Sequence, residues 1–148
     1  MIAVSELGRD LLARTDDGYN VIVGSTAARP DLFASYRDHP RKLVKLLIRG
    51  VLVPTTAAGR YQILARYFDV YKAQLRLPDF SPASQDAIAC QLIRECKALD
   101  DIEAGRFGAA LAKCRSRWAS LPGAGYGQHE NLAENLEAAY VAAGGGLA

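Results

Sequence analysis

The chain is poor in the residues that build metal centres and crosslinked folds. Its 148 residues include only three cysteines and two histidines. Cys90, Cys96 and Cys114 form no C-x-x-C pair, and one thiol stays unpaired in any disulfide arrangement. His39 and His129 have no partner at catalytic or metal-ligand spacing. We therefore expect no metal ion and no histidine-based hydrolase chemistry, and we interpret the cysteines as small apolar groups of the interior.

Charge of one sign and long apolar runs are also scarce. The formal net charge is +2, with no concentrated basic face, so nucleic acid is not an expected partner. No apolar run approaches the roughly 18 residues that a membrane-spanning helix requires. The opening stretch MIAVSELGRD becomes polar too early for a signal peptide. We expect no stable membrane insertion of this chain, and we expect a monomer.

The composition that is present predicts one ordinary globular domain. Half of the residues are hydrophobic and 23% are charged, in a chain long enough to bury a core. We expect a single domain over residues 1–148, with a frayed glycine-rich tail at 144–148.

Periodicity places a helical body around a small β lobe. It predicts a helix over 2–14, a turn at 16–20 and a strand at 21–24, with VLVP at 51–54 as a second strand. Three prolines exclude long helices between 25 and 60. The pair Ser81-Pro82 predicts an N-cap and a first helical position. The expected fold class is α+β, with a cleft between body and lobe that suits an extended ligand.

Beyond residue 62, apolar side chains recur at helical spacing in four stripes. The stripes are Leu64, Phe68, Tyr71 and Leu75; Ile88, Leu92, Cys96 and Leu99; Phe107, Leu111, Cys114 and Trp118; and Leu132, Leu136 and Tyr140.

The stretch LPGAGYGQ, residues 121–128, contains three glycines. A phosphate-binding loop would follow a strand and open a helix, whereas here a predicted helix and a proline come first and lysine is missing. Two readings stay open on composition. The loop either connects two helices, or it presents bare backbone, including Gly125, beside Tyr126 as a platform for a sugar ring.

Two further stretches contain candidate site residues. Glycoside cleavage requires a carboxyl proton donor, and among sixteen acidic residues Glu6 lies where the first helix meets the irregular segment. In TTAAGRYQIL, Gly59 permits close approach and Gln62 offers a donor and an acceptor. The alternative is a simple turn into a helix, with Tyr61 in the core. The stretch YRDHPRK reads as a polar groove or as a solvated loop.

Several stretches together resemble one known family. GYNVIVG, YRDHPRKLV, AAGRYQIL, LPDFSPASQDAIA and WASLPGAGYGQ are similar, in order and spacing, to the phage lambda lysozyme family over roughly residues 3 to 130. The resemblance implies a lysozyme-like fold and a phage endolysin that degrades peptidoglycan. It further implies a lytic transglycosylase that cleaves the β-1,4 bond between N-acetylmuramic acid and N-acetylglucosamine and leaves a 1,6-anhydro end. No metal or organic cofactor is implied.

The resemblance also assigns residues. Ser5-Glu6, followed by Gly18-Tyr19, matches the family's catalytic motif and makes Glu6 the single acid and base. The family's cleft-lining segment corresponds to Gly59, Tyr61 and Gln62, and the loop that faces the glutamate corresponds to Gly125 and Tyr126. The expected partner is a peptidoglycan glycan strand. The protein would be made in the host cytoplasm and act in the periplasm and cell wall.

This chain departs from the family pattern in two places. Only five residues precede Glu6, and KLLIRGVLVPTT is more apolar than the corresponding family segment. Two alternatives stay open: hydrolysis by water with a second carboxylate, or a glycan-binding module without turnover. The candidates for a second carboxylate are Asp10, Asp16, Asp17 and Asp38. The turn that contains His39 is interpreted as structural support.

Overall fold

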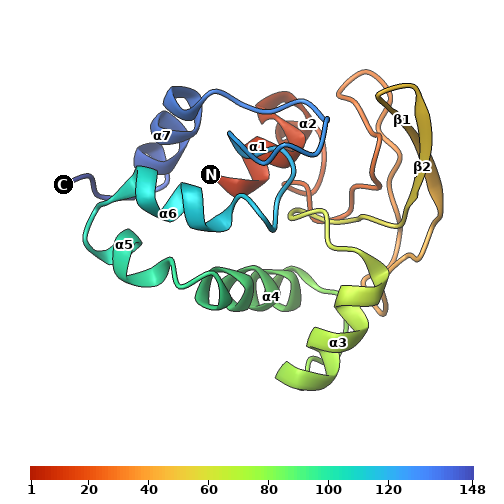
Figure 1. The fold of residues 1–148 in the computed structure, drawn as a ribbon. Helices are drawn as coiled ribbons and strands as arrows, with labels where there is room; N and C mark the ends of the chain where they lie inside the picture. Colours follow the sequence, from red (N-terminus) through yellow and green to blue (C-terminus); the bar gives the residue numbers. More distant parts are fainter. The chain divides into compact units, whose positions relative to one another are not determined.

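The computed structural model describes residues 1–148 and contains helices and one small antiparallel sheet (Figure 1). The elements are α1 (Ile2–Leu7), α2 (Arg9–Ala13), β1 (Val44–Ile48), β2 (Val51–Thr55), α3 (Ala65–Leu75), α4 (Pro82–Glu95), α5 (Leu99–Glu103), α6 (Phe107–Cys114) and α7 (Ala133–Ala142). The predicted α+β class is therefore confirmed. No helix combines the length and the apolar character needed to cross a bilayer.

The chain divides into two compact units. The first unit comprises Met1–Glu6 and Cys90–Ala148, and the second comprises Leu7–Ala89. The N-terminal segment thus belongs with the C-terminal half of the chain, although more than eighty residues separate them in sequence. The expectation of one domain over residues 1–148 stays a prediction.

The first helical stretch is interrupted at Gly8, so the predicted continuous helix over 2–14 is wrong. Gly8 has φ 75° and ψ 154°, a backbone conformation that glycine adopts without a Cβ penalty and that ends α1. The chain then re-enters a helix at Arg9. As a consequence Glu6 lies in the last turn of α1, directly before the break.

The β lobe contains a hairpin that differs from the predicted strand pair. β2 pairs with β1 in antiparallel register, Leu47 opposite Leu52 and Ile48 opposite Val51. The predicted strand at 21–24 makes only isolated bridges from Val21 and Ile22. The predicted pairing of VIVG with VLVP is therefore wrong, while residues 51–54 are a strand as predicted.

The hairpin turn explains the missed pairing. Arg49 and Gly50 connect the two strands with φ 49° and 80°, the positive values of a tight two-residue turn. Arginine is an uncommon first residue for this turn, because a side chain is disfavoured at positive φ. The short connection makes β1 the partner of β2. Three prolines did exclude helices from this region as predicted, since none lies between Ala13 and Ala65.

An aromatic cluster fills the second unit. The rings of Phe68 and Phe80 meet edge to face with centroids 5.0 Å apart, and the His39 ring lies 4.7 Å from that of Phe80. All three side chains are buried. The predicted stripe on α3 is confirmed at Phe68 and Tyr71, which face this core.

α4 begins at Pro82 as predicted, and Ser81 occupies the N-cap position, since its carbonyl accepts the Gln85 backbone N–H at 2.9 Å. The Asp79 carboxylate accepts hydrogen bonds from the Ser81 backbone N–H at 2.9 Å and from the Ser84 hydroxyl at 3.0 Å. The Ser81 hydroxyl donates to the Ser84 hydroxyl instead of accepting from an amide. These hydrogen bonds hold the pKa of Asp79 below its usual range.

The core of the first unit is built largely from the third and fourth predicted stripes. Phe107 and Leu111 on α6 are buried, as is Leu136 on α7, and the Phe107 ring lies 5.1 Å from that of Tyr140. Two assignments are corrected: α6 ends at Cys114, so the buried Trp118 lies beyond it, and Leu132 is exposed.

The cysteines follow the predicted packing only in part. Cys114 is buried, Cys96 is half-buried and Cys90 is exposed, and none is in a disulfide. Burial is the main reason that the pKa of Cys114 is raised to about 12. The tail beyond Gly144 has no regular structure, although the Ala148 backbone N–H donates to the Gly105 carbonyl.

Gln85 holds together loops from three parts of the second unit. Its side-chain amide donates to the carbonyls of Tyr19 at 3.0 Å and Phe80 at 2.9 Å, and its oxygen accepts from the Arg60 backbone N–H at 2.9 Å. The side chain is completely buried. A Cβ at Gly59 would collide with this amide, which explains the glycine at that position.

We expect Gln85→Leu to destabilise the fold by about 2–4 kcal/mol, because it leaves buried backbone groups without hydrogen-bond partners in an apolar setting. Urea unfolding measures the change. The matched control is Gln74→Leu on exposed α3 surface, which should stay within about 0.5 kcal/mol of the parent. Equal effects of the two variants would contradict a bridging role for Gln85.

Candidate active site

Glu6 lies in a hydrogen-bonded cluster that joins the two ends of the first unit's sequence. The Ser120 hydroxyl donates to Glu6 Oε1 at 2.5 Å and lies 2.8 Å from the Ser5 hydroxyl. The Asn131 side-chain amide donates to the Ser5 carbonyl at 2.9 Å, and its backbone N–H donates to the Ser120 carbonyl at 2.9 Å. The side chains that form this cluster around Glu6, those of Ser5, Ser120 and Asn131, are all uncharged.

This setting changes the acidity of the carboxyl group. Burial raises the pKa of Glu6 above the ordinary value for a glutamate, and the hydrogen bonds from Ser120 oppose the rise without cancelling it. No cation is paired with Glu6 in the structure. A carboxyl group in this state remains protonated to a higher pH than a solvated one, and it can donate its proton to a bound ligand.

The glycine-rich loop starts and ends at this cluster. Ser120 and Asn131 flank residues 121–130, and both contact Ser5 or Glu6. Inside the loop the Glu130 carboxylate accepts hydrogen bonds from the backbone N–H groups of Gly123 at 2.8 Å and Gly125 at 2.7 Å. The amide of Gly125 is therefore occupied, in contrast to the bare backbone edge that composition suggested.

Tyr126 is the most exposed aromatic side chain of this loop. Half of its surface is accessible, and its hydroxyl donates to the Ser116 carbonyl at 3.0 Å. Fixing the hydroxyl in this way restrains a ring that remains half exposed. This geometry suits stacking of a ring-shaped ligand.

The second unit contains the other predicted site segment. Gly59 donates its N–H to the Val21 carbonyl at 2.8 Å, and the Gln62 side-chain amide donates to the Gly59 carbonyl at 2.9 Å. Gln62 has φ 49°, so the turn is held in a conformation that is uncommon for a residue with a side chain. One of its two amide N–H donors is used inside the turn, which leaves the second N–H and the side-chain oxygen for a ligand.

Asp86 organises two tyrosines beside this turn. The hydroxyls of Tyr61 and Tyr19 donate to Asp86 Oδ1 at 2.7 and 2.9 Å. The Arg60 guanidinium lies over both rings, 5.1 Å from the centroid of Tyr19 and 6.0 Å from that of Tyr61. Desolvation and the Asp86 carboxylate raise the pKa of both phenols, so they stay neutral donors. Tyr61 is half-buried, between the two predicted alternatives of core and site.

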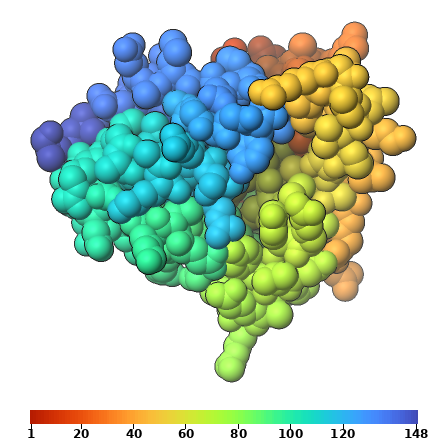
Figure 2. Space-filling view, in the orientation of Figure 1, coloured from red at the N-terminus to blue at the C-terminus, as the bar shows by residue number.

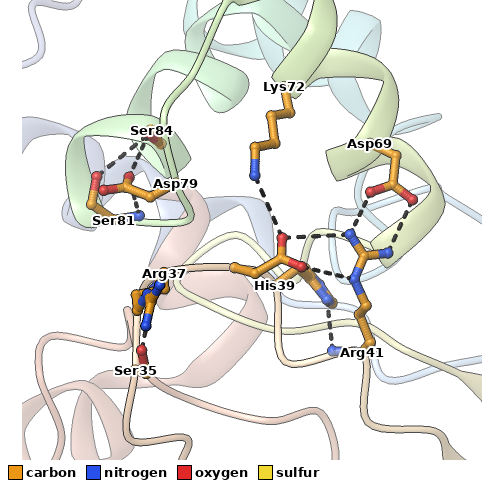
Figure 3. Close-up of polar contacts among 10 residues, drawn as sticks. Ser35, Arg37, His39, Arg41, Asp69, Lys72, Asp79, Ser81 and Ser84 are labelled. Atoms are coloured by element: carbon orange, nitrogen blue, oxygen red, sulfur yellow. Dashed lines mark hydrogen bonds and ion pairs between the residues drawn. The ribbon is translucent and has the colours of Figure 1, made fainter.

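The Asp38–His39 turn has a structural network around it (Figure 3). Buried His39 donates from Nε2 to the Ile63 carbonyl at 2.8 Å and accepts at Nδ1 from the Arg41 backbone N–H at 3.0 Å. This pattern requires the neutral ring, and burial accordingly lowers the His39 pKa. Arg41 bridges Asp38 and Asp69.

The candidates for a second carboxylate are mostly engaged. Asp17 pairs with Arg60 at 2.5 Å, Asp38 pairs with Arg41 and Lys72, and Asp16 accepts from the Tyr36 hydroxyl at 2.5 Å. Asp10 is exposed in the first turn of α2. No three His, Cys, Asp or Glu side chains are grouped as metal ligands.

The sequence analysis identified some residues of both clusters but missed the residues that hold them in place. Glu6, Gly125 and Tyr126 belong to the first unit, and Gly59, Tyr61 and Gln62 to the second. The supporting residues Ser120, Asn131, Glu130, Gln85 and Asp86 were not predicted. Only Ser120 carried a signal, because it directly precedes the glycine-rich loop. The others act through partners between 5 and 126 residues away, which periodicity does not detect.

Comparisons with known proteins identify the family. A profile of the Endolysin family matches residues 1–147. The endolysin of Escherichia phage P2 is 48% identical over 149 residues, which cover 98% of this chain and 89% of that protein. The endolysin of Escherichia phage lambda is 52% identical over 128 residues, which cover 86% of this chain and 76% of that protein.

Solved structures show the same fold. Bacteriophage lambda lysozyme complexed with a chitohexasaccharide superposes with a TM-score of 0.87 at 48% identity, covering 99% of this chain and 91% of that one. A second structure, lysozyme from bacteriophage lambda, has a TM-score of 0.83 at 47% identity over the same shares. The predicted lysozyme-like fold and the predicted family are both confirmed. The chain therefore belongs to the endolysin family, phage enzymes that degrade the bacterial cell wall.

Proposed function

We propose that this endolysin is a lytic transglycosylase that uses Glu6 as its single acid and base. The observation that carries the proposal is the state of Glu6, a partly buried carboxyl group with a raised pKa and only neutral hydrogen-bond partners. Such a group keeps its proton to a higher pH than a solvated glutamate does, and it can donate that proton to the leaving oxygen of a glycosidic bond.

In the first step, neutral Glu6 protonates the oxygen that links N-acetylmuramic acid to N-acetylglucosamine. The bond from this oxygen to the anomeric carbon breaks through an oxocarbenium-like state. When Glu6 loses its proton, the Ser120 hydroxyl donates its hydrogen bond to the carboxylate that forms. Its position thus limits the rise in the Glu6 pKa and stabilises Glu6 after the proton has left.

In the second step, the Glu6 carboxylate takes the proton of the C6 hydroxyl of the muramyl sugar. The hydroxyl oxygen bonds to the anomeric carbon and closes the 1,6-anhydro ring. Glu6 returns to its neutral form, and no water is consumed. The nucleophile belongs to the substrate, so the mechanism has no need of a second carboxylate from the protein.

A glycan strand of peptidoglycan is the proposed ligand. The related lambda lysozyme was solved in complex with a chitohexasaccharide, an oligosaccharide. In this chain, the half-exposed Tyr126 side chain suits sugar stacking, and the Gln62 side chain and the Tyr61 ring are placed by internal hydrogen bonds. Gly125 leaves room for a ligand beside the loop, since a Cβ there would meet nothing within 4 Å, whereas the space at Gly59 is filled by the Gln85 amide. The site of action is the periplasm and the cell wall.

We expect Glu6→Gln to lower the release of soluble products from purified peptidoglycan by roughly 10²–10⁴-fold, because the amide cannot donate or accept the proton. Mass spectrometry of the parent's products should show muropeptides about 18 Da lighter than reducing ones, the mass of one water. Reducing ends from the parent would mean hydrolysis, and no products from a folded parent would mean a glycan-binding module. Either outcome contradicts the proposal.

We expect Ser120→Ala to move the alkaline limb of the activity profile to higher pH. The hydrogen bond from the Ser120 hydroxyl favours the charged form of Glu6, so its removal raises the Glu6 pKa and keeps the acid protonated over a wider range. Rates of peptidoglycan solubilisation from pH 4 to 9 measure the shift. Ser116→Ala, an exposed serine of the same unit, is the control and should leave the limb in place. A limb that moves to lower pH would contradict the assignment of the limb to Glu6.

We expect Glu6→Gln to stabilise the fold at neutral pH. A carboxyl group whose pKa is raised on folding contributes nothing while both states are protonated, and it destabilises the fold as pH rises from its unfolded pKa through its folded pKa. The stability gain of the variant should thus be present at pH 7 and vanish below the ordinary carboxyl pKa. Thermal melts at the two pH values test this, and an equal or lower melting temperature at pH 7 would refute it.

A further inference from the structure

Two of the three cysteines lie against each other in the first unit. The Cys96 thiol, directly after α4, and the Cys114 thiol, at the end of α6, are hydrogen-bond partners, although the whole of α5 lies between them in the sequence. Cys114 is buried and Cys96 is half-buried. Figure 2 shows the segments from the end of α4 to α6, in green and turquoise, adjoining one another at the molecular surface.

The backbone is well defined at both cysteines. The Cys96 backbone N–H donates to the Leu92 carbonyl at 3.0 Å, and the next residue, Lys97, ends the helical path with a φ of 55°. Cys114 is the last residue of α6, and its carbonyl accepts the Arg117 backbone N–H at 2.9 Å. Each thiol is therefore held at the end of a helix, where only side-chain rotation is needed to move the sulfur atom.

Neighbouring side chains join the same two segments independently of the thiols. The Lys113 ammonium donates to the Lys97 carbonyl at 3.0 Å and pairs with Asp101 at 2.5 Å. The Arg117 guanidinium lies 3.4 Å from a carboxylate oxygen of Glu95. Residues beside one cysteine thus contact residues beside the other, so the proximity of the two sulfur atoms does not depend on the thiol rotamers alone.

The third cysteine is placed differently. Cys90 is exposed on α4, and it points to another face of the helix than Cys96, since six residues make about 1.7 helical turns. Packing of thiols as small apolar groups accounts for one buried cysteine, Cys114. It does not require a second, half-buried sulfur in contact with the first.

We propose that Cys96 and Cys114 are a disulfide site, which an oxidant of the disulfide class closes when the protein is in an oxidising compartment such as the bacterial periplasm. Cys96 is the thiol that the oxidant meets, because it is half-buried. Burial raises the pKa of the Cys114 thiol to about 12, so Cys114 reacts second. This modification is separate from the proposed catalysis.

The crosslink forms by two thiol–disulfide exchanges. The Cys96 thiolate attacks one sulfur of the oxidant's disulfide, forms a mixed disulfide and releases the first oxidant thiol. The Cys114 sulfur then bonds to the Cys96 sulfur and displaces the second oxidant thiol. The two cysteine thiols lose two electrons and two protons, and the oxidant takes up both as its disulfide becomes two thiols. The product joins the ends of α4 and α6 in the unit that also contains Glu6.

Peptide mapping tests the site. After incubation with oxidised glutathione and alkylation of the remaining thiols in denaturant, we expect peptides joined through Cys96 and Cys114 and an alkylated Cys90. Glu6→Gln protein should form the same crosslink, so a failure of the catalytic proposal would not be mistaken for a failure of this one. Three alkylated cysteines, a stable glutathione adduct at Cys96 or a crosslink through Cys90 would overturn the proposal.

Serine variants measure the consequence for stability. Oxidation should raise the melting temperature of the parent protein by roughly 5–10 °C, because closing a loop of roughly 18 residues lowers the entropy of the unfolded chain. Dithiothreitol should reverse the rise. Cys90→Ser is the matched control and should show the full rise, whereas Cys96→Ser and Cys96→Ala should show none. Melts of the reduced proteins establish that each variant is folded. An equal rise in the Cys96 variants, or none in the parent, would count against the crosslink.

Discussion

The hydrogen bond between Ser120 and Glu6 is the interaction on which the proposed chemistry of this protein depends. It joins residues that are 114 positions apart, and with Ser5 and Asn131 it fixes the end of α1 against both ends of the glycine-rich loop. Burial raises the pKa of the Glu6 carboxyl group, and the hydrogen bonds from Ser120 oppose that rise. A glutamate in water would lose its proton well below neutral pH and could not serve as the acid.

The helix break at Gly8 and the hydrogen bonds of Gln85 position the segments that contain the candidate site residues. Ending α1 at Gly8 places Glu6 in the last turn of α1, while the following residues start the second unit. In that unit, Gln85 uses one buried amide to satisfy three backbone groups of separate loops, including the turn that contains Tyr61 and Gln62. Precise loop geometry therefore depends on a few buried polar groups that are fully satisfied, in addition to the apolar core.

The hairpin differs from both clusters because its most distinctive side chains face outward. Tight Arg49-Gly50 geometry and cross-strand pairing define its backbone, yet Leu47 and Leu52 gain little burial from it.

Several features were determined by sequence alone. Local patterns identified the α+β class, the helical stripes at Phe68 and Leu111, and the start of α4 at Pro82, because periodicity and proline act over a few residues. The motifs pointed to the family, which the comparisons confirmed. Tertiary structure alone decided that β2 pairs with β1 and that Glu130 occupies the amide of Gly125. The acidity of Glu6 also belongs to this second group, since a pKa depends on burial and on hydrogen-bond partners that the linear sequence does not place beside the carboxyl group.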